Sequence, residues 1–135
     1  MKVITLNGET GSKKTELIGE IKKELCSQGA KEHFYKEEGA DNNDFKALVT
    51  FNNKKIAFCS IGYIADKGHL ESEYILRGLV FASKNNADIL INAYTEPFKE
   101  FPESVYKRIV GNYIKIPISK TSDLTSIKNQ IISKI

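Results

Sequence analysis

The sequence predicts a three-layer α/β/α fold, in which helices flank a mainly parallel sheet of about five to six strands. Short β-rich runs alternate with stretches whose apolar residues recur at helical spacing, a pattern typical of this class. The run "ADILINA", residues 87–93, is apolar enough for a strand buried on both faces. Because the 135 residues contain no repeat, low-complexity segment or linker, we expect one domain spanning residues 1–135.

The first two predicted elements are a strand and a helix joined by a short loop. Residues 2–7, "KVITLN", form a β-rich run that ends at Gly8. From residue 14 to residue 28 the apolar side chains recur along one side of a helix, and Gly29 is a natural stop. The chain therefore begins with a strand, a loop and a helix.

The stretch of residues 30–44 is polar and acidic in its middle. We expect it to be mostly an exposed loop, with at most a short strand around residues 33–35. Two β-rich runs follow, residues 45–51 and residues 54–62. Because asparagine tolerates positive φ, the Asn-Asn pair between these runs predicts a tight hairpin.

The C-terminal part is predicted to add strands and helices in alternation. They are a helix over residues 70–84, a strand over 87–93, a helix over 103–110, a strand over 113–119 and a closing helix. The pair Asn85-Asn86 would end the first of these helices. Ser122 is predicted to cap the closing helix, because its hydroxyl can accept backbone N–H groups. That helix would bury apolar side chains at positions 124, 127, 131 and 135.

Composition is that of an ordinary globular protein, with 41% hydrophobic and 27% charged residues. The sequence has no apolar run of membrane-span length, so we expect a cytoplasmic protein with no membrane partner. The net charge of +3 is mild and lysines occur as scattered pairs, so we expect no nucleic-acid partner. Cys26 and Cys59 lack ligand spacing, which favours reduced thiols that serve packing.

One motif carries chemistry. The segment "LNGETGSKKTELI", residues 6–18, nearly matches the phosphate-binding pattern G-x-x-x-x-G-K-[ST]. Gly8, Lys14 and Thr15 occupy its first Gly, its Lys and its hydroxyl position, while Lys13 replaces the second Gly. A left-handed backbone at Lys13 would cost about 1–2 kcal/mol, which is bearable. The alternative interpretation is an ordinary turn whose lysines serve solubility.

The stretch "VITLNGETGSKKTELI" resembles the first strand, loop and helix of the P-loop nucleoside triphosphatases. The resemblance implies a nucleoside triphosphate ligand, ATP in preference to GTP, with Mg²⁺ as cofactor. The implied phosphate-binding residues are Gly8, Glu9, Thr10, Gly11, Ser12, Lys13, Lys14 and Thr15. Lys14 would also act in catalysis, stabilising charge on the phosphoryl oxygens, and Thr15 would place its hydroxyl on Mg²⁺.

The hairpin between the first two long helices is similar to that of Ras-like GTPases, whose second hairpin strand ends in D-x-x-G. Here residues 59–62 match, with Gly62 kept and Cys59 at the position of the metal-linked aspartate. Asp66 is the candidate that would approach Mg²⁺ instead, and a loop carboxylate or helix cap is the other interpretation. The guanine-reading N-K-x-D signature is absent, since "NAYT" at residues 92–95 is a poor substitute, which argues against a working GTPase.

The ligand is expected at the carboxyl ends of the strands that end near Asn7, Ile61 and Ala93, where open α/β sheets bind ligands. Five other residues have either a site role or an ordinary one as surface or packing residues. They are Ser60, Tyr63, Arg77, Glu96 and Arg108. Two functions remain open: an NTPase or phosphotransferase, and a non-catalytic module of the same fold that acts by binding a partner protein.

Overall fold

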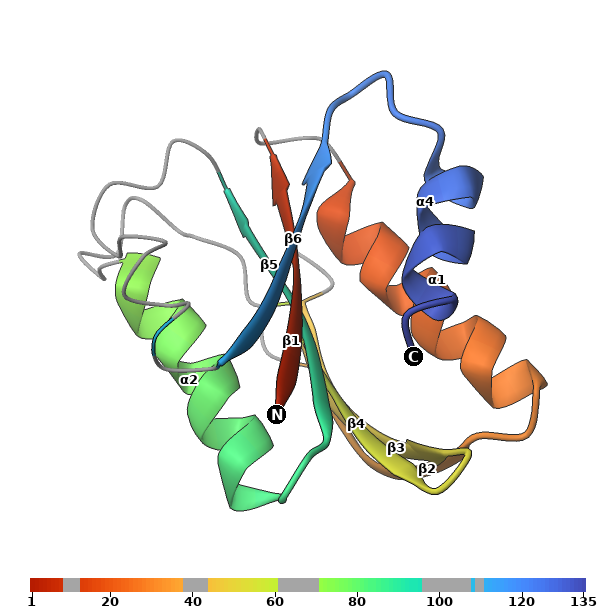
Figure 1. Ribbon diagram of the computed structural model, residues 1–135, viewed down its shortest axis with the longest axis vertical. Coiled ribbons are helices and arrows are strands. Elements are labelled where there is room, and N and C mark those ends of the chain that lie inside the picture. The colour runs from red at the N-terminus through yellow and green to blue at the C-terminus, as the bar shows by residue number, and fades with distance from the viewer. Residues whose placement is uncertain (9–12, 38–43, 61–70, 96–107, 109–110) are drawn as a thin grey trace.

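The computed structural model describes residues 1–8, 13–37, 44–60, 71–95, 108 and 111–135. These residues form one six-stranded mixed sheet in the order β2-β3-β4-β5-β1-β6. The strands are β1 (Lys2–Gly8), β2 (Lys31–Glu37), β3 (Phe45–Phe51), β4 (Lys54–Cys59), β5 (Ile89–Thr95) and β6 (Asn112–Ile118). The helices are α1 (Lys14–Ser27), α2 (Glu71–Lys84) and α4 (Leu124–Ile132). Helices α1 and α4 lie on one face of the sheet and α2 lies on the other (Figure 1).

Most of the sheet is parallel. Strands β4, β5, β1 and β6 are parallel neighbours, while β3 is antiparallel to both β4 and β2. The tight hairpin between β3 and β4 is confirmed, because Asn52 and Asn53 have φ values of 50° and 62°. The predicted α/β class with a mainly parallel sheet is therefore correct.

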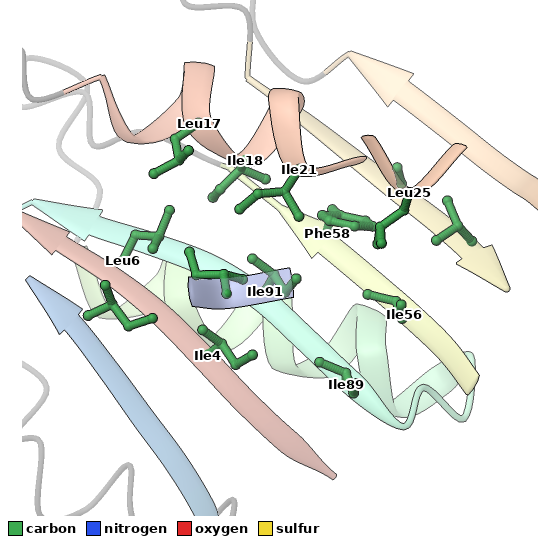
Figure 2. Packing of buried hydrophobic residues seen from close by; sticks show 14 of the residues in the cluster. Ile4, Leu6, Leu17, Ile18, Ile21, Leu25, Ile56, Phe58, Ile89 and Ile91 are labelled. Atoms are coloured by element: carbon green, nitrogen blue, oxygen red, sulfur yellow. The ribbon is translucent and has the colours of Figure 1, made fainter. Parts of the chain in front are cut away.

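The larger core lies between the sheet and α1. Leu17, Ile18, Ile21 and Leu25 recur at helical spacing and lie over apolar side chains of β1, β4 and β5 (Figure 2). Each fully buried Leu or Ile contributes about 1.5–3 kcal/mol, so this stripe fixes where α1 sits. Helix α4 adds Ile131 to the same core. The C-terminus of α1 lies before Gly29, which was predicted to end this helix. The φ of Gly29 is 101°, a value that suits glycine.

Helix α2 covers the opposite face through a second core. Its members include Val3, Leu48, Ala57, Cys59, Leu79, Ala82 and Leu90. Gly78 allows α2 to lie close to β4, because a Cβ added there would be 3.3 Å from the Cys59 sulfur. The prediction that Cys59 serves packing is thus confirmed, and Cys26 and Cys59 are thiols that form no disulfide.

Residues 31–37 form the edge strand β2, although we expected mostly loop with at most a short strand there. All seven residues of β2 are exposed, so no apolar alternation marks the strand in the sequence. Backbone pairing with β3 and two aromatic contacts hold it in place. The Phe34 ring lies 5.6 Å from Phe81, and the Tyr35 ring stacks at 5.6 Å on Phe45.

Helix α4 is capped by Asp123, which corrects the prediction of Ser122. The Asp123 carboxylate accepts hydrogen bonds from the backbone N–H groups of Thr125 and Ser126. The Ser122 hydroxyl instead accepts from the backbone N–H of Ser119, at 2.9 Å. Ser122 therefore stabilises the turn that precedes the helix, and the next residue caps it.

Of the helix predicted over residues 103–110, only Arg108 is described, and it is exposed and helical. None of the helices in the described ranges combines the length and the apolar character that a membrane span requires.

Candidate phosphate-binding site

The candidate site lies where β1 ends and α1 begins. Gly8 is the last residue of β1, and α1 starts at Lys14 after its N-cap residue Lys13. Lys13 has φ 64° and ψ 31°, which is the left-handed conformation expected of the glycine that it replaces, and its side chain is exposed. Glu9, Thr10, Gly11 and Ser12, the other predicted phosphate ligands, lie outside the described residues.

Lys14 is buried, which is unusual for a lysine. Its side chain is only 9% exposed, and its ammonium group donates a hydrogen bond to the carbonyl oxygen of Gly8 at 3.0 Å. This bond ties the start of α1 to the end of β1. An ammonium group carries three N–H donors, so it can contact several acceptor oxygens at one time.

The N-terminus of α1 adds positive potential beside this ammonium. The side chain of Lys13 makes no capping hydrogen bond to the first turn. Backbone N–H groups in a first turn lack partners within the helix, and the helix dipole is positive there. An anion near this turn would be stabilised both by the helix and by Lys14.

Thr15 contacts a carboxylate that the sequence analysis did not identify. Its hydroxyl donates to Asp44 Oδ1 at 3.1 Å, and Asp44 is only 3% exposed. Asp44 directly precedes β3, at the end of the polar stretch that we interpreted as loop. The contact joins residues that are 29 positions apart, so no local pattern in the sequence pairs Asp44 with Thr15. The place of Asp44 directly before a β-rich run is the only sequence feature that draws attention to it. The bond directs the Thr15 proton toward Asp44 and leaves hydroxyl lone pairs for another partner.

Cys59, at the position of the metal-linked aspartate, is not beside β1. Strand β5 lies between β4 and β1, so Cys59 is about two strand spacings, or about 10 Å, from the neighbouring part of β1. Cys59 pairs with Asn92, and Asn92 pairs with Thr5. The Asn92 side chain is buried and its Oδ1 accepts a 2.6 Å hydrogen bond from the Thr5 hydroxyl. The Asn92 side chain therefore links the two central strands β5 and β1.

The other candidate residues divide into three groups. Ser60 is structural, because its buried Oγ accepts the backbone N–H of Phe45 at 3.1 Å. Arg77 and Arg108 are exposed. Tyr63, Asp66 and Glu96 lie outside the described residues. Within the described ranges, no group of three His, Cys, Asp or Glu residues is arranged to hold a metal ion without a further ligand.

The carboxyl ends of β4, β5 and β1 meet at one edge of the sheet, because the three strands are parallel neighbours. This is the edge where the sequence places the ligand.

Comparison with models of protein families, with curated proteins and with solved structures finds no match to this chain.

Proposed function

We propose that this chain is a small cytoplasmic protein of the P-loop NTPase type that binds a nucleoside triphosphate, ATP in preference to GTP, with Mg²⁺. One observation carries the proposal. Directly before the buried Lys14, whose ammonium bonds to the Gly8 carbonyl, Lys13 adopts the backbone conformation of a glycine. An ordinary turn has no need of a left-handed lysine, which costs about 1–2 kcal/mol, or of a buried ammonium group.

Lys14 and the first turn of α1 would bind the phosphates together. Charge-assisted hydrogen bonds from an ammonium to phosphate contribute about 1.5–3 kcal/mol each. Lys14 is held by its bond to Gly8, so its charge needs little reorganisation when an anion arrives. If the phosphoryl group is transferred or hydrolysed, the same charge would stabilise the oxygens as negative charge develops on them.

The pair Thr15 and Asp44 fits Mg²⁺ bound with nucleotide. Mg²⁺ prefers oxygen ligands and is usually held by one or two carboxylates together with phosphates and water. Asp44 fixes the direction of the Thr15 hydroxyl, so its lone pairs would face a cation at the start of α1. Mg²⁺, when bound, would neutralise charge on the phosphates. Asp66, the carboxylate that the sequence favours, stays a candidate for the same task.

A second candidate function is a non-catalytic module that keeps this fold and binds a partner protein. The observation that favours it is Cys59, which occupies the sequence position of the metal-linked aspartate but is 3% exposed, packs under α2 and is separated from β1 by β5. A packed thiol at this position cannot supply the charge of that aspartate.

Calorimetric titration with Mg·ATP and Mg·GTP, together with thermal melting, tests the proposal. A ligand that binds only the folded state at 100 times its Kd adds about 2.7 kcal/mol to the free energy of unfolding. Lys14→Ala should weaken binding about tenfold or more. Lys23→Ala is the matched control, because Lys23 is an exposed lysine of the same helix. A flat response to both nucleotides would leave the non-catalytic module, and equal affinities for the parent and Lys14→Ala would refute the role of Lys14.

A further inference from the structure

A groove lies on the face of the sheet that carries α2, beside β3. Its volume is about 540 Å³. The residues that line it are Lys46, Leu76, Arg77, Val80, Phe81 and Lys84. None of them belongs to the β1–α1 connection, so the groove is separate from the candidate phosphate site.

The groove exposes apolar surface. Leu76 and Val80 are one helical turn apart on α2 and are 41% and 51% exposed. On the strand side, Phe34 is 41% exposed and its ring contacts Phe81. Leu76, Val80 and Phe34 are not members of the core under α2, which is formed by residues such as Leu79 and Ala82, whereas Phe81 packs against that core. Covering them with another apolar side chain would be favourable by about 25 cal/mol per Å².

Among the side chains that the structure describes, the charged residues that line the groove are all cations. Lys46 comes from β3, and Arg77 and Lys84 come from α2. Lys36 is paired directly with Lys46 across β2 and β3, so its side chain is on the same face. The groove thus combines exposed aliphatic surface with a concentration of positive charge.

We propose that this groove docks a segment of a partner protein that carries carboxylates beside an apolar anchor side chain. The carboxylates would pair with Arg77, Lys46 and Lys84, and the anchor would cover Leu76 and Val80. A second copy of this chain is disfavoured, since a two-fold contact would bring the same cations together.

Single-stranded nucleic acid shares the negative charge but fits the apolar part less well. Bases stack on aromatic rings that present open faces. Here the Phe34 and Phe81 rings contact each other, with their planes inclined at 45°, and the remaining apolar residues are aliphatic. Aliphatic side chains are better covered by a leucine or a similar anchor than by a base.

The test starts with a random peptide library selected on the full chain, with counter-selection on an Arg77→Glu, Val80→Gln double variant. The enriched peptides are expected to be acidic with an apolar anchor. The affinity of one such synthetic peptide is then measured by fluorescence anisotropy against the single variants. We expect Arg77→Glu to weaken binding about tenfold, and rising ionic strength to weaken it further. Val80→Gln should weaken binding about fivefold without changing the salt dependence.

Lys23→Glu provides the matched control, because it reverses an exposed helical charge on the other side of the sheet and should leave peptide affinity unchanged. Thermal melting of each variant separates loss of binding from loss of folding, and each variant is expected to melt cooperatively, since Arg77 and Val80 are exposed. Enrichment of peptides without acidic residues would overturn the proposal, as would equal losses in Arg77→Glu and Lys23→Glu. Tighter binding of an oligothymidylate than of the selected peptide would also overturn it, in favour of nucleic acid.

Discussion

The hydroxyl of Thr15 donates a hydrogen bond to Asp44 Oδ1 over 3.1 Å, and this bond joins the first turn of α1 to the residue before β3. This contact holds together two segments that flank the candidate site. A carboxylate can only accept from this hydroxyl, whereas an amide can also donate to it. A substitution at Asp44 can therefore change the direction of the Thr15 hydroxyl proton while the hydroxyl itself stays in place.

Asp44→Asn should reduce the gain in nucleotide affinity that Mg²⁺ provides, while binding in the presence of EDTA stays near that of the parent. The reason is that the amide can turn the Thr15 proton toward the cation position. Calorimetric titration of the nucleotide with Mg²⁺ and with EDTA gives the two affinities, and their ratio is the gain that Mg²⁺ provides. Thr15→Ser keeps the hydroxyl and should retain the Mg²⁺ gain. An unchanged gain in Asp44→Asn would remove Asp44 from the metal site.

Lys13→Gly should be more stable to urea than Lys13→Ala by about 1 kcal/mol, because glycine alone adopts the left-handed conformation without a steric penalty. In a regular first turn the order would be reversed, since alanine favours helix over glycine. Nucleotide affinity of Lys13→Gly should equal or exceed that of the parent, because the Lys13 side chain is exposed and glycine adopts the same backbone conformation. An alanine variant as stable as the glycine variant would contradict the backbone conformation found here.

Gly78→Ala should destabilise the protein even though alanine is the better helix former. The added methyl would lie 3.3 Å from the sulfur of Cys59, which is tighter than ordinary packing, whereas its distance of 3.4 Å from the Cβ of Cys59 is an ordinary van der Waals contact. In a Cys59→Ala background the same substitution should be close to neutral. Urea denaturation of the four proteins measures the coupling, expected at about 1 kcal/mol. Absence of coupling would show that α2 and β4 separate at no cost.

Asp123→Ala should lower the free energy of unfolding by about 1 kcal/mol, the usual cost of losing an N-cap. Ser126→Ala at a neighbouring exposed position keeps the cap and should change stability by less than about 0.5 kcal/mol. Circular dichroism melting distinguishes the two variants. If Ser122→Ala rather than Asp123→Ala shortens the helix, the cap belongs to Ser122.

The sequence was sufficient where structure depends on neighbours along the chain. The apolar spacing of Leu17, Ile18 and Ile21 defines α1, and the Asn52-Asn53 pair defines the hairpin, because both signals are local. The N-cap of α4 was ambiguous in the sequence, because the neighbouring residues Ser122 and Asp123 both carry side-chain oxygens that can cap a helix. Only the turn that draws the Ser122 hydroxyl to Ser119 decides between them.

Contacts between distant segments could not be predicted in this way. Strand β2 exposes all its residues, and its pairing with β3 is made by backbone groups that leave no trace in the side-chain pattern. The position of β5 between β4 and β1 likewise decides that Cys59 lies away from β1. In the site, Lys13, Lys14 and Thr15 were found because they share one motif. Asp44 was missed because it approaches from another segment.

The position of β1 in the sheet also determines when this protein can finish folding. Its two neighbours begin at Ile89 and Asn112, whereas β2, β3 and β4 pair with one another in sequence order. On the ribosome, the meander of β2 to β4 can form early, while β1 waits for most of the chain to be synthesised. During that wait Val3, Ile4 and Leu6 have no strands beside them, so β1 is a natural client of a chaperone until β5 is made, and β6 can join the sheet only after β1 has done so.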